Sequence, residues 1–132
     1  MIVDSSALVA ILKREPDRAA FSALLETTQD VKVSAATYFE TCIMIDSLRQ
    51  PAMSRMLDDF IEVARIAIEP VTAEQAKIAR QAYRDYGRGS GHPANLNFGD
   101  CFSYAPARDK REPMLWKGDD FEHTDLRPAI NQ

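Results

Sequence analysis

Cysteine is scarce in this 132-residue chain, which contains only Cys42 and Cys101. Both lie inside apolar runs and neither belongs to a closely spaced pair, so the sequence predicts neither a disulfide scaffold nor a zinc ribbon. Glycine is also sparse, with 5 residues, and no segment is built from one or two residue types. These features exclude collagen-like, low-complexity and wholly disordered proteins.

The chain has no excess of positive charge. Its 16 Lys and Arg residues against 20 Asp and Glu residues give a net charge of −4 at pH 7. A histone-like or polybasic protein is therefore excluded, and any contact with nucleic acid must be local or bridged by a metal ion.

Long apolar runs are missing as well. No stretch approaches the ~18 to 20 apolar residues that a membrane helix needs, and Asp4 stands where a signal peptide would carry Lys or Arg. We therefore expect a protein without a membrane segment that acts in the cytoplasm. At ~100 to 200 residues per domain, the length predicts a single domain over residues 1–132.

Short β-branched segments alternate with helical patterns along the chain. Strands are expected at 2–3, 31–33, 66–68 and 114–116, and helices at 7–12, 20–25, 35–48, 53–64 and 76–86 and from residue 99. Thr72 and Gln75 form the pattern of a capping box. This alternation predicts an α/β sandwich around a mainly parallel sheet, in which ligands bind outside the carboxyl ends of the strands.

Acidic residues stand at points that such a fold brings together. Asp4 and the pair Asp119-Asp120 follow the first and last expected strands, Asp100 opens a helix, and Glu40 lies in an otherwise apolar helix. Carboxylates that converge within about 4 to 6 Å raise one another's pKa, so a cluster of this kind is stable chiefly around a hard divalent cation. Mg²⁺ or Mn²⁺ is the expected ion.

Each acidic residue also has a purely structural interpretation. Asp4 suits a helix cap, Asp100 complements a helix dipole, and Asp119-Asp120 beside Gly118 suit a turn. Glu40 is the least easily explained in this way, because its neighbours are apolar and a buried carboxylate needs a partner.

Motifs spread over almost the whole chain match one known family. They are MIVDSSA at 1–7, SAATYFE at 34–40, PVTAEQA at 70–76, YGRG at 86–89, HPANLNFGDC at 92–101 and EPMLWKGDDF at 112–121. In this order they resemble the PIN-domain ribonucleases, and among them the VapC toxins of bacterial toxin–antitoxin pairs. The resemblance implies a PIN-like three-layer α/β/α sandwich with a short, mainly parallel central sheet. It also implies an endoribonuclease dependent on Mg²⁺ or Mn²⁺, which leaves 5′-phosphate and 3′-hydroxyl ends and is restrained by a cognate antitoxin.

The same resemblance assigns roles to the acidic residues. Asp4 and Asp100 match the principal metal-binding aspartates of the family, and Glu40 matches the acidic residue that completes the site through metal or water. Asp119 matches the fourth catalytic position. The implied mechanism is in-line attack of a water, oriented through Glu40 or Asp119, on a phosphate polarised by the metal.

Two further residues support this set, and one departs from the family pattern. Ser6 is expected to orient Asp4 through a hydrogen bond, and Asp120 is expected to play a supporting or capping role. Pro106 stands where relatives continue a helix, and an interior proline costs roughly 3 kcal/mol. We therefore expect the helix that follows Asp100 to kink or to stop early.

Local cations must steer RNA, because the net charge is negative. Arg84, Arg88 and Lys117 are the candidates, with His92 more typical of a loop residue than of a catalyst. Trp116 and Phe98 are expected in the core rather than as platforms for bases.

Partners are predicted from the apolar helices between Phe21 and Phe60. Their surface suits a helix of the antitoxin, and the same face suits a homodimer.

Two other functions remain open at this point. A phosphatase of the haloacid-dehalogenase type is disfavoured, because that class needs a second Asp where this chain has Ser6. A degenerate PIN module that only binds its partner is kept open by Pro106. RNA fragments, free phosphate or no turnover would distinguish these possibilities from a ribonuclease.

Overall fold

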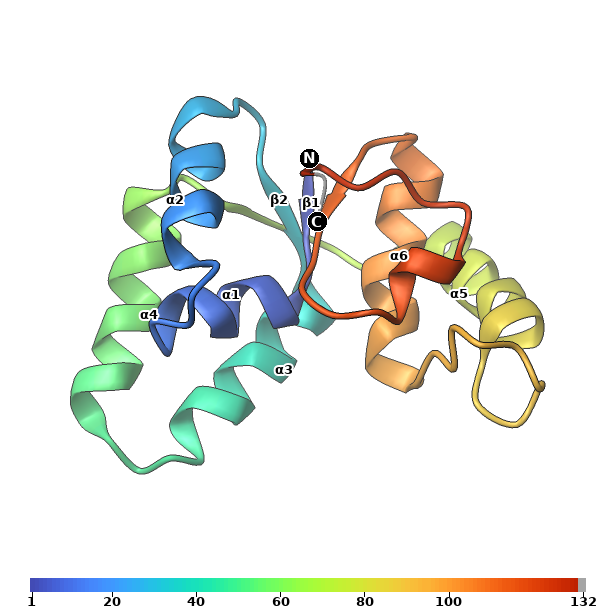
Figure 1. Cartoon of the computed structure of the whole chain (residues 1–132), viewed down its shortest axis with the longest axis horizontal. Coiled ribbons are helices and arrows are strands. Elements are labelled where there is room, and N and C mark those ends of the chain that lie inside the picture. The colour runs from blue at the N-terminus through green and yellow to red at the C-terminus, as the bar shows by residue number, and fades with distance from the viewer. Residues whose placement is uncertain (131–132) are drawn as a thin grey trace.

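Four short parallel strands form the central sheet in a computed structural model of the chain, which describes residues 1–130 (Figure 1). The strands lie in the order β3 (Ala67–Glu69), β2 (Lys32–Ser34), β1 (Ile2–Val3) and β4 (Met114–Leu115), and every neighbouring pair is parallel. The expected parallel sheet is confirmed. Because all strands run in the same direction, their carboxyl ends meet at one edge of the sheet.

Helices cover both faces of this sheet. They are α1 (Ser5–Leu12), α2 (Arg18–Thr27), α3 (Ala35–Asp46), α4 (Pro51–Val63), α5 (Ala73–Tyr86) and α6 (Phe98–Lys110), followed by a 3₁₀ turn at Phe121–His123. Figure 1 shows α1 to α4 on one side of the strands and α5 with α6 on the other. The predicted three-layer α/β/α sandwich is therefore confirmed.

Alternation along the strands divides the core into two clusters. Val3 and Leu115 pack with α1, α2 and α4, whereas Ile2 and Met114 pack with α5 and α6. Successive side chains of a strand point to opposite faces, so even two-residue strands anchor both helical layers. The first residue after β1, Asp4, is thereby held at the junction of the two layers.

Two local expectations are wrong in part: the early stop of α6 and the contact of the Gln75 side chain with Thr72. Helix α6 does not stop early but runs through Pro106 to Lys110, and the buried proline ring offsets part of the missing backbone hydrogen bond. At the start of α5, the Thr72 hydroxyl accepts a hydrogen bond from the Gln75 backbone N–H at 3.1 Å, as a capping box requires. The Gln75 amide, however, donates to Asp109 of α6 at 3.4 Å instead of reaching back to Thr72.

No helix within residues 1–130 combines the length and the apolar character required to cross a membrane. Cys42 and Cys101 are both free thiols. Burial raises the pKa of Cys101 to about 11, so this thiol stays protonated at neutral pH.

Candidate active site

Asp4 is fixed in place by three hydrogen bonds. It is the N-cap of α1 and is 3% exposed. Its Oδ2 accepts from the Ser6 backbone N–H at 3.0 Å and from the Ser6 hydroxyl at 2.6 Å, and its Oδ1 accepts from the Ser103 hydroxyl at 2.5 Å. The hydrogen bond expected from Ser6 is present. The capping interpretation and the functional one are therefore compatible, because capping sets the carboxylate's orientation at the carboxyl end of β1.

Ser103 is a contact that the sequence analysis missed. It lies one turn after Asp100 on α6, and its hydroxyl is also 3.0 Å from the Thr37 hydroxyl of α3. Residues three apart share a helix face, so the spacing from Asp100 was the available signal. Through Ser103, the α6 helix holds Asp4 from the side opposite to α1.

Glu40 lies on α3 and contacts two other elements. Its Oε1 accepts a hydrogen bond from the Ser5 hydroxyl at 3.0 Å. Its other carboxylate oxygen presses against Gly99, where an added Cβ would lie 2.0 Å from Oε2. Glu40 therefore sits at the N-terminal end of α6, where the helix dipole favours negative charge.

Asp100 stands in the first turn of α6 within a reciprocal capping box. The Asn97 side chain accepts from the Asp100 backbone N–H at 2.8 Å, and the Asp100 carboxylate accepts from the Asn97 backbone N–H at 2.9 Å. The pKa of Asp100 is raised to about 6, first by burial and then by the negative charges of Asp4, Asp120 and Glu40, against a lowering by the Asn97 amide. Three carboxylates from other parts of the chain thus act electrostatically on Asp100.

The two aspartates after β4 differ in their relation to this cluster. Asp120 is among the main charges that raise the pKa of Asp100, whereas Asp119 is not. The backbone carbonyl of Asp119 accepts from the Glu122 N–H at 3.2 Å in the turn before the 3₁₀ helix. The electrostatics therefore favour Asp120, which the sequence analysis gave only a supporting role, as the fourth carboxylate.

The candidate RNA-binding cations differ in whether acidic side chains already pair with them. The Lys117 ammonium pairs with Glu15 at 3.3 Å and Asp17 at 3.0 Å, and the hydrogen bond to Asp17 is the main reason that its pKa is raised. Its backbone N–H donates to the Ser6 hydroxyl at 3.0 Å, so Lys117 supports Asp4 indirectly. Arg84 and Arg88 are exposed, on α5 and on the loop after it.

The two aromatic residues expected in the core differ in their exposure. Trp116 is 4% exposed and belongs to the core, as expected, but Phe98 is 80% exposed, so its expected burial is wrong. Phe98 is the first residue of α6, and its ring packs against Phe102 of the same helix, whereas Cys101 and Tyr104 further along α6 belong to the core. His92 is held within its loop, where its Nδ1 accepts from the Ala94 N–H at 3.1 Å.

The donor set fits a hydrated hard cation. Within residues 1–130, no Lys or Arg forms a salt bridge with Asp4, Glu40 or Asp100, so their charge is not balanced by the protein. In the same range no three acidic, His or Cys side chains surround one point closely enough to hold a metal ion by themselves. Mg²⁺ keeps several waters and needs only one or two carboxylates plus substrate phosphate, which matches this open arrangement.

A buried hydroxyl, that of Ser34, lies at the end of β2, the strand next to β1. Ser34 ends β2, is 2% exposed, and its Oγ has no hydrogen-bond partner in the described part of the chain. Ile2 is paired with Lys32, so Ser34 and Asp4 both stand at the carboxyl ends of neighbouring strands. Buried hydroxyls are normally satisfied by protein or water, so Ser34 is available to an ordered water at this edge of the sheet.

Comparison with known proteins agrees with this site. The sequence model of the PIN domain matches residues 1–126. The chain is 55% identical over 132 residues to ribonuclease VapC28 of Mycobacterium tuberculosis, with 100% of this chain and 99% of the relative covered.

Solved structures share the fold at low sequence identity. The crystal structure of Mycobacterium tuberculosis VapC20, a toxin that cleaves the sarcin–ricin loop, has a TM-score of 0.70 at 20% identity and covers 96% of this chain and 98% of that one. VapBC2 of Rickettsia felis, bound to a DNA fragment from its promoter, has a TM-score of 0.73 at 13% identity, with 96% and 95% covered.

Fold and carboxylate site together define a PIN domain. The chain belongs to the PIN-domain family and, within it, to the VapC ribonucleases, the toxins of toxin–antitoxin systems, which hydrolyse phosphodiester bonds of RNA. This membership excludes the haloacid-dehalogenase alternative.

Proposed function

We propose that the carboxylates around Asp4 and Asp100 form the catalytic centre of an endoribonuclease that works with Mg²⁺ or Mn²⁺. The observation that carries this proposal is the set of Asp4, Glu40 and Asp100, each held by hydrogen bonds and none paired with a basic side chain of residues 1–130. In agreement with this geometry, burial and the neighbouring carboxylates raise the pKa of Asp100 to about 6. When bound, the metal would polarise the scissile phosphate and lower the pKa of the attacking water. Asp4 and Asp100 would hold it.

The protein's own groups orient that chemistry. Ser6 and Ser103 fix both oxygens of Asp4, while the capping box fixes Asp100 relative to the first turn of α6. Glu40, oriented by Ser5, is close enough to Asp100 to raise its pKa and is our candidate for positioning the water and accepting its proton. In-line attack by water then leaves 5′-phosphate and 3′-hydroxyl ends.

Asp119 and Asp120 can be compared directly as candidates for the fourth catalytic carboxylate. We propose Asp120 for this role instead of Asp119, because Asp120 contributes to the pKa of Asp100. Asp120→Asn is expected to lower the cleavage rate more than Asp119→Asn. A larger loss with Asp119→Asn would restore the original assignment.

The test of the whole proposal is cleavage of end-labelled total RNA by the purified chain with Mg²⁺, with Mn²⁺ and with EDTA. We expect discrete fragments with either metal and none with EDTA, and we expect Asp4→Ala to abolish cutting. If the folded protein binds Mg²⁺ but cuts no RNA under any condition, the chain is a degenerate PIN module that only binds its partner.

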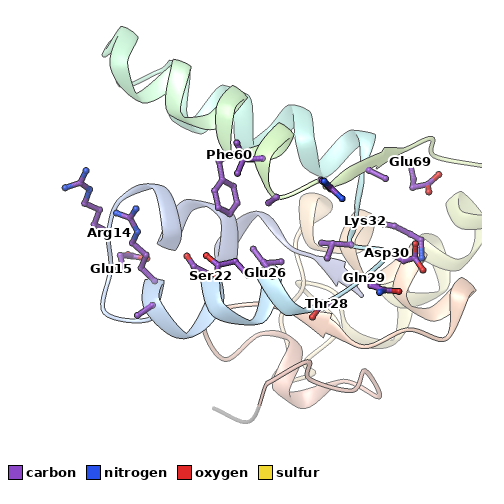
Figure 2. A pocket seen from close by; sticks show the side chains of 18 of the residues that line it. Arg14, Glu15, Ser22, Glu26, Thr28, Gln29, Asp30, Lys32, Phe60 and Glu69 are labelled. Carbon is purple, nitrogen blue, oxygen red and sulfur yellow. The ribbon is translucent and has the colours of Figure 1, made fainter.

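An antitoxin segment is our proposed occupant of a cleft of about 1290 Å³ between α2 and α4, within the helical region expected to bind partners. Figure 2 shows Phe60 projecting from α4 toward α2, with charged side chains around it. The cleft is lined by four cationic and four acidic side chains, namely Arg14, Arg18, Lys32, Arg65, Glu15, Glu26, Asp30 and Glu69. This even mixture of charges suits a protein segment with an apolar anchor better than a uniformly charged polymer. Phe60→Asp should leave RNA cleavage intact but prevent neutralisation by the antitoxin.

Three broader expectations stay proposals. We propose one domain, although residues 131–132 of the expected range 1–132 lie outside the described part. We propose action in the cytoplasm, which suits two free thiols. A homodimer remains a prediction, to be measured by light scattering.

A further inference from the structure

A second cleft lies next to the candidate active site. It has a volume of about 650 Å³, separates α5 from the start of α6, and is lined by Arg80, Tyr83, Arg88, Asn97, Phe98 and Phe102, among others. Sites of this size hold small organic groups, and a nucleobase fits comfortably within it. None of the proposed catalytic carboxylates lines this cleft.

The walls of the cleft carry exposed aromatic rings. Phe98 is 80% exposed and packs edge to face against Phe102, with ring centroids 4.9 Å apart. Tyr83, on the opposing helix α5, is 50% exposed. Exposed aromatic side chains next to a nuclease centre are the kind of surface on which unpaired bases stack.

The charge of the cleft also favours a polyanion. Among the described residues, its lining contains Arg80 and Arg88 and no acidic side chain, although the chain as a whole has a net charge of −4. The cleft between α2 and α4, by contrast, mixes both signs evenly. RNA phosphates are anions that such a local excess of arginine attracts.

Hydrogen bonds tie the walls of the cleft together, and one wall includes the residue that caps Asp100. The Tyr83 hydroxyl donates to the Arg88 carbonyl at 3.2 Å, and the Arg88 backbone N–H donates to the Leu96 carbonyl at 2.9 Å. Tyr83 also lies across Gly87, where an added Cβ would be 2.5 Å from a ring carbon. Asn97 lines the cleft and at the same time caps α6 through Asp100, so the cleft begins beside the carboxylate cluster.

We propose that this cleft binds one unpaired base of the RNA substrate, stacked on Phe98, while Arg80 and Arg88 contact the flanking phosphates. The inference rests on the proposed function, since it assigns the binding of the nucleotide beside the cleaved bond. Phe98 is thus a positioning residue that limits cleavage to RNA whose bases are free to unstack.

The test measures binding of a fluorescein-labelled, single-stranded oligoribonucleotide of mixed sequence in EDTA, where metal-dependent cleavage is absent. Phe98→Leu keeps an apolar side chain without a π face and is expected to weaken binding about tenfold. Phe98→Trp should bind like the unaltered chain, and its additional indole fluorescence should be quenched by RNA. Arg88→Gln should also weaken binding, whereas Ile68→Ala, an exposed apolar change on the edge strand β3, should not.

Cleavage kinetics with Mg²⁺ separate this inference from the proposed function. Phe98→Leu is expected to raise KM and to leave kcat nearly unchanged. If the unaltered chain cuts RNA and Phe98→Leu has the same KM and affinity, the inference is overturned and the proposed function stands. If RNA quenches Phe98→Trp while the unaltered chain cuts nothing, the base site stands and the proposed function fails.

Light scattering tests whether a second copy of the chain, instead of RNA, occupies the cleft. If Phe98→Leu changes the oligomeric state of the chain while its affinity for RNA is unchanged, a second copy covers Phe98 and the inference is overturned. Quenching of Phe98→Trp that is equal with a ribose-phosphate oligomer lacking bases would overturn it too, because stacking requires a base.

Discussion

The absence of a side chain at Gly99 leaves room for the Glu40 carboxylate in the candidate site. A Cβ at this position would lie 2.0 Å from Glu40 Oε2, too close for any real contact. Gly99→Ala should therefore displace Glu40 and lower the cleavage rate by about 10- to 100-fold, since small misplacements of catalytic groups are costly. Single-turnover cleavage of a defined RNA measures this effect.

A double variant that also lacks the Glu40 carboxylate is the control for Gly99→Ala. If Gly99→Ala acts by displacing this carboxylate, the double variant with Glu40→Ala should be no slower than Glu40→Ala alone. Additive losses would mean that the alanine disturbs α6 instead of Glu40. Circular dichroism of each variant checks that the fold is kept.

The raised pKa of Asp100 makes the metal-free protein sensitive to pH. A carboxyl group with a folded-state pKa of about 6, above the ordinary 3.8, binds more protons in the folded state than in the unfolded one. Its contribution to the free energy of unfolding is thus full below pH 4 and is lost as pH rises through 6. Because the group is partly exposed, we expect the loss to be about 1 to 2 kcal/mol.

Asp100→Asn removes this penalty. In EDTA the variant should melt at a higher temperature than the unaltered chain at pH 7, and the difference should shrink at pH 4. Mg²⁺ at pH 7 should reverse the order, because it stabilises only the chain that binds it. A melting-temperature difference that is independent of pH would contradict the assigned pKa.

At the scale of elements, the start of α6 links helix formation to catalysis. Asn97 caps α6 and holds Asp100, whereas Thr72 caps α5 and only accepts from Gln75. Asn97→Ala and Thr72→Ala should each cost about 1 kcal/mol of stability. Only Asn97→Ala should also weaken Mg²⁺-dependent cleavage, as measured by denaturant unfolding and RNA cutting on the same samples. Equal activity in the two variants would show that the cap is purely structural.

Elements were largely predictable from the sequence because their signals are local. The strand at 2–3 and the helix ending at Tyr86 follow from β-branched residues, apolar spacing and a capping Thr. The course of α6 through Pro106 was not predictable, because the burial that offsets the missing hydrogen bond comes from packing of distant segments.

The same distinction applies to the site. Asp4, Glu40 and Asp100 stand out by type and motif, and the pKa of Asp100 reflects all three. The spacing from Asp100 puts Ser103 on the same face of α6, but its hydrogen bond to Asp4 depends on how α6 docks against β1. The contact of Gly99 with Glu40 depends likewise on how α6 docks against α3. The exposure of Phe98 depends on its place at the start of α6, where the packing of distant segments decides which side chains are covered.

At the scale of the whole molecule, the parallel sheet gathers acidic residues at one edge of an already acidic protein. Such a surface repels RNA at long range, so binding has to rely on metal and on a small basic patch. Arg80 and Arg88 are the cations of the cleft beside the site, while Lys117 is paired with Glu15 and Asp17. If Arg80 and Arg88 bind the RNA as proposed, the protein makes few phosphate contacts.

This charge distribution predicts a shallow salt dependence. Each phosphate neutralised on a single strand contributes roughly −0.7 to the slope of log affinity against log salt concentration, so two arginines predict a slope of about −1.4. Titrations of a single-stranded oligoribonucleotide in EDTA at several KCl concentrations measure it, and Arg88→Gln should reduce the slope by roughly half. A slope steeper than about −4 would require a basic surface that neither cleft contains, and would move the main RNA contacts away from α5 and α6.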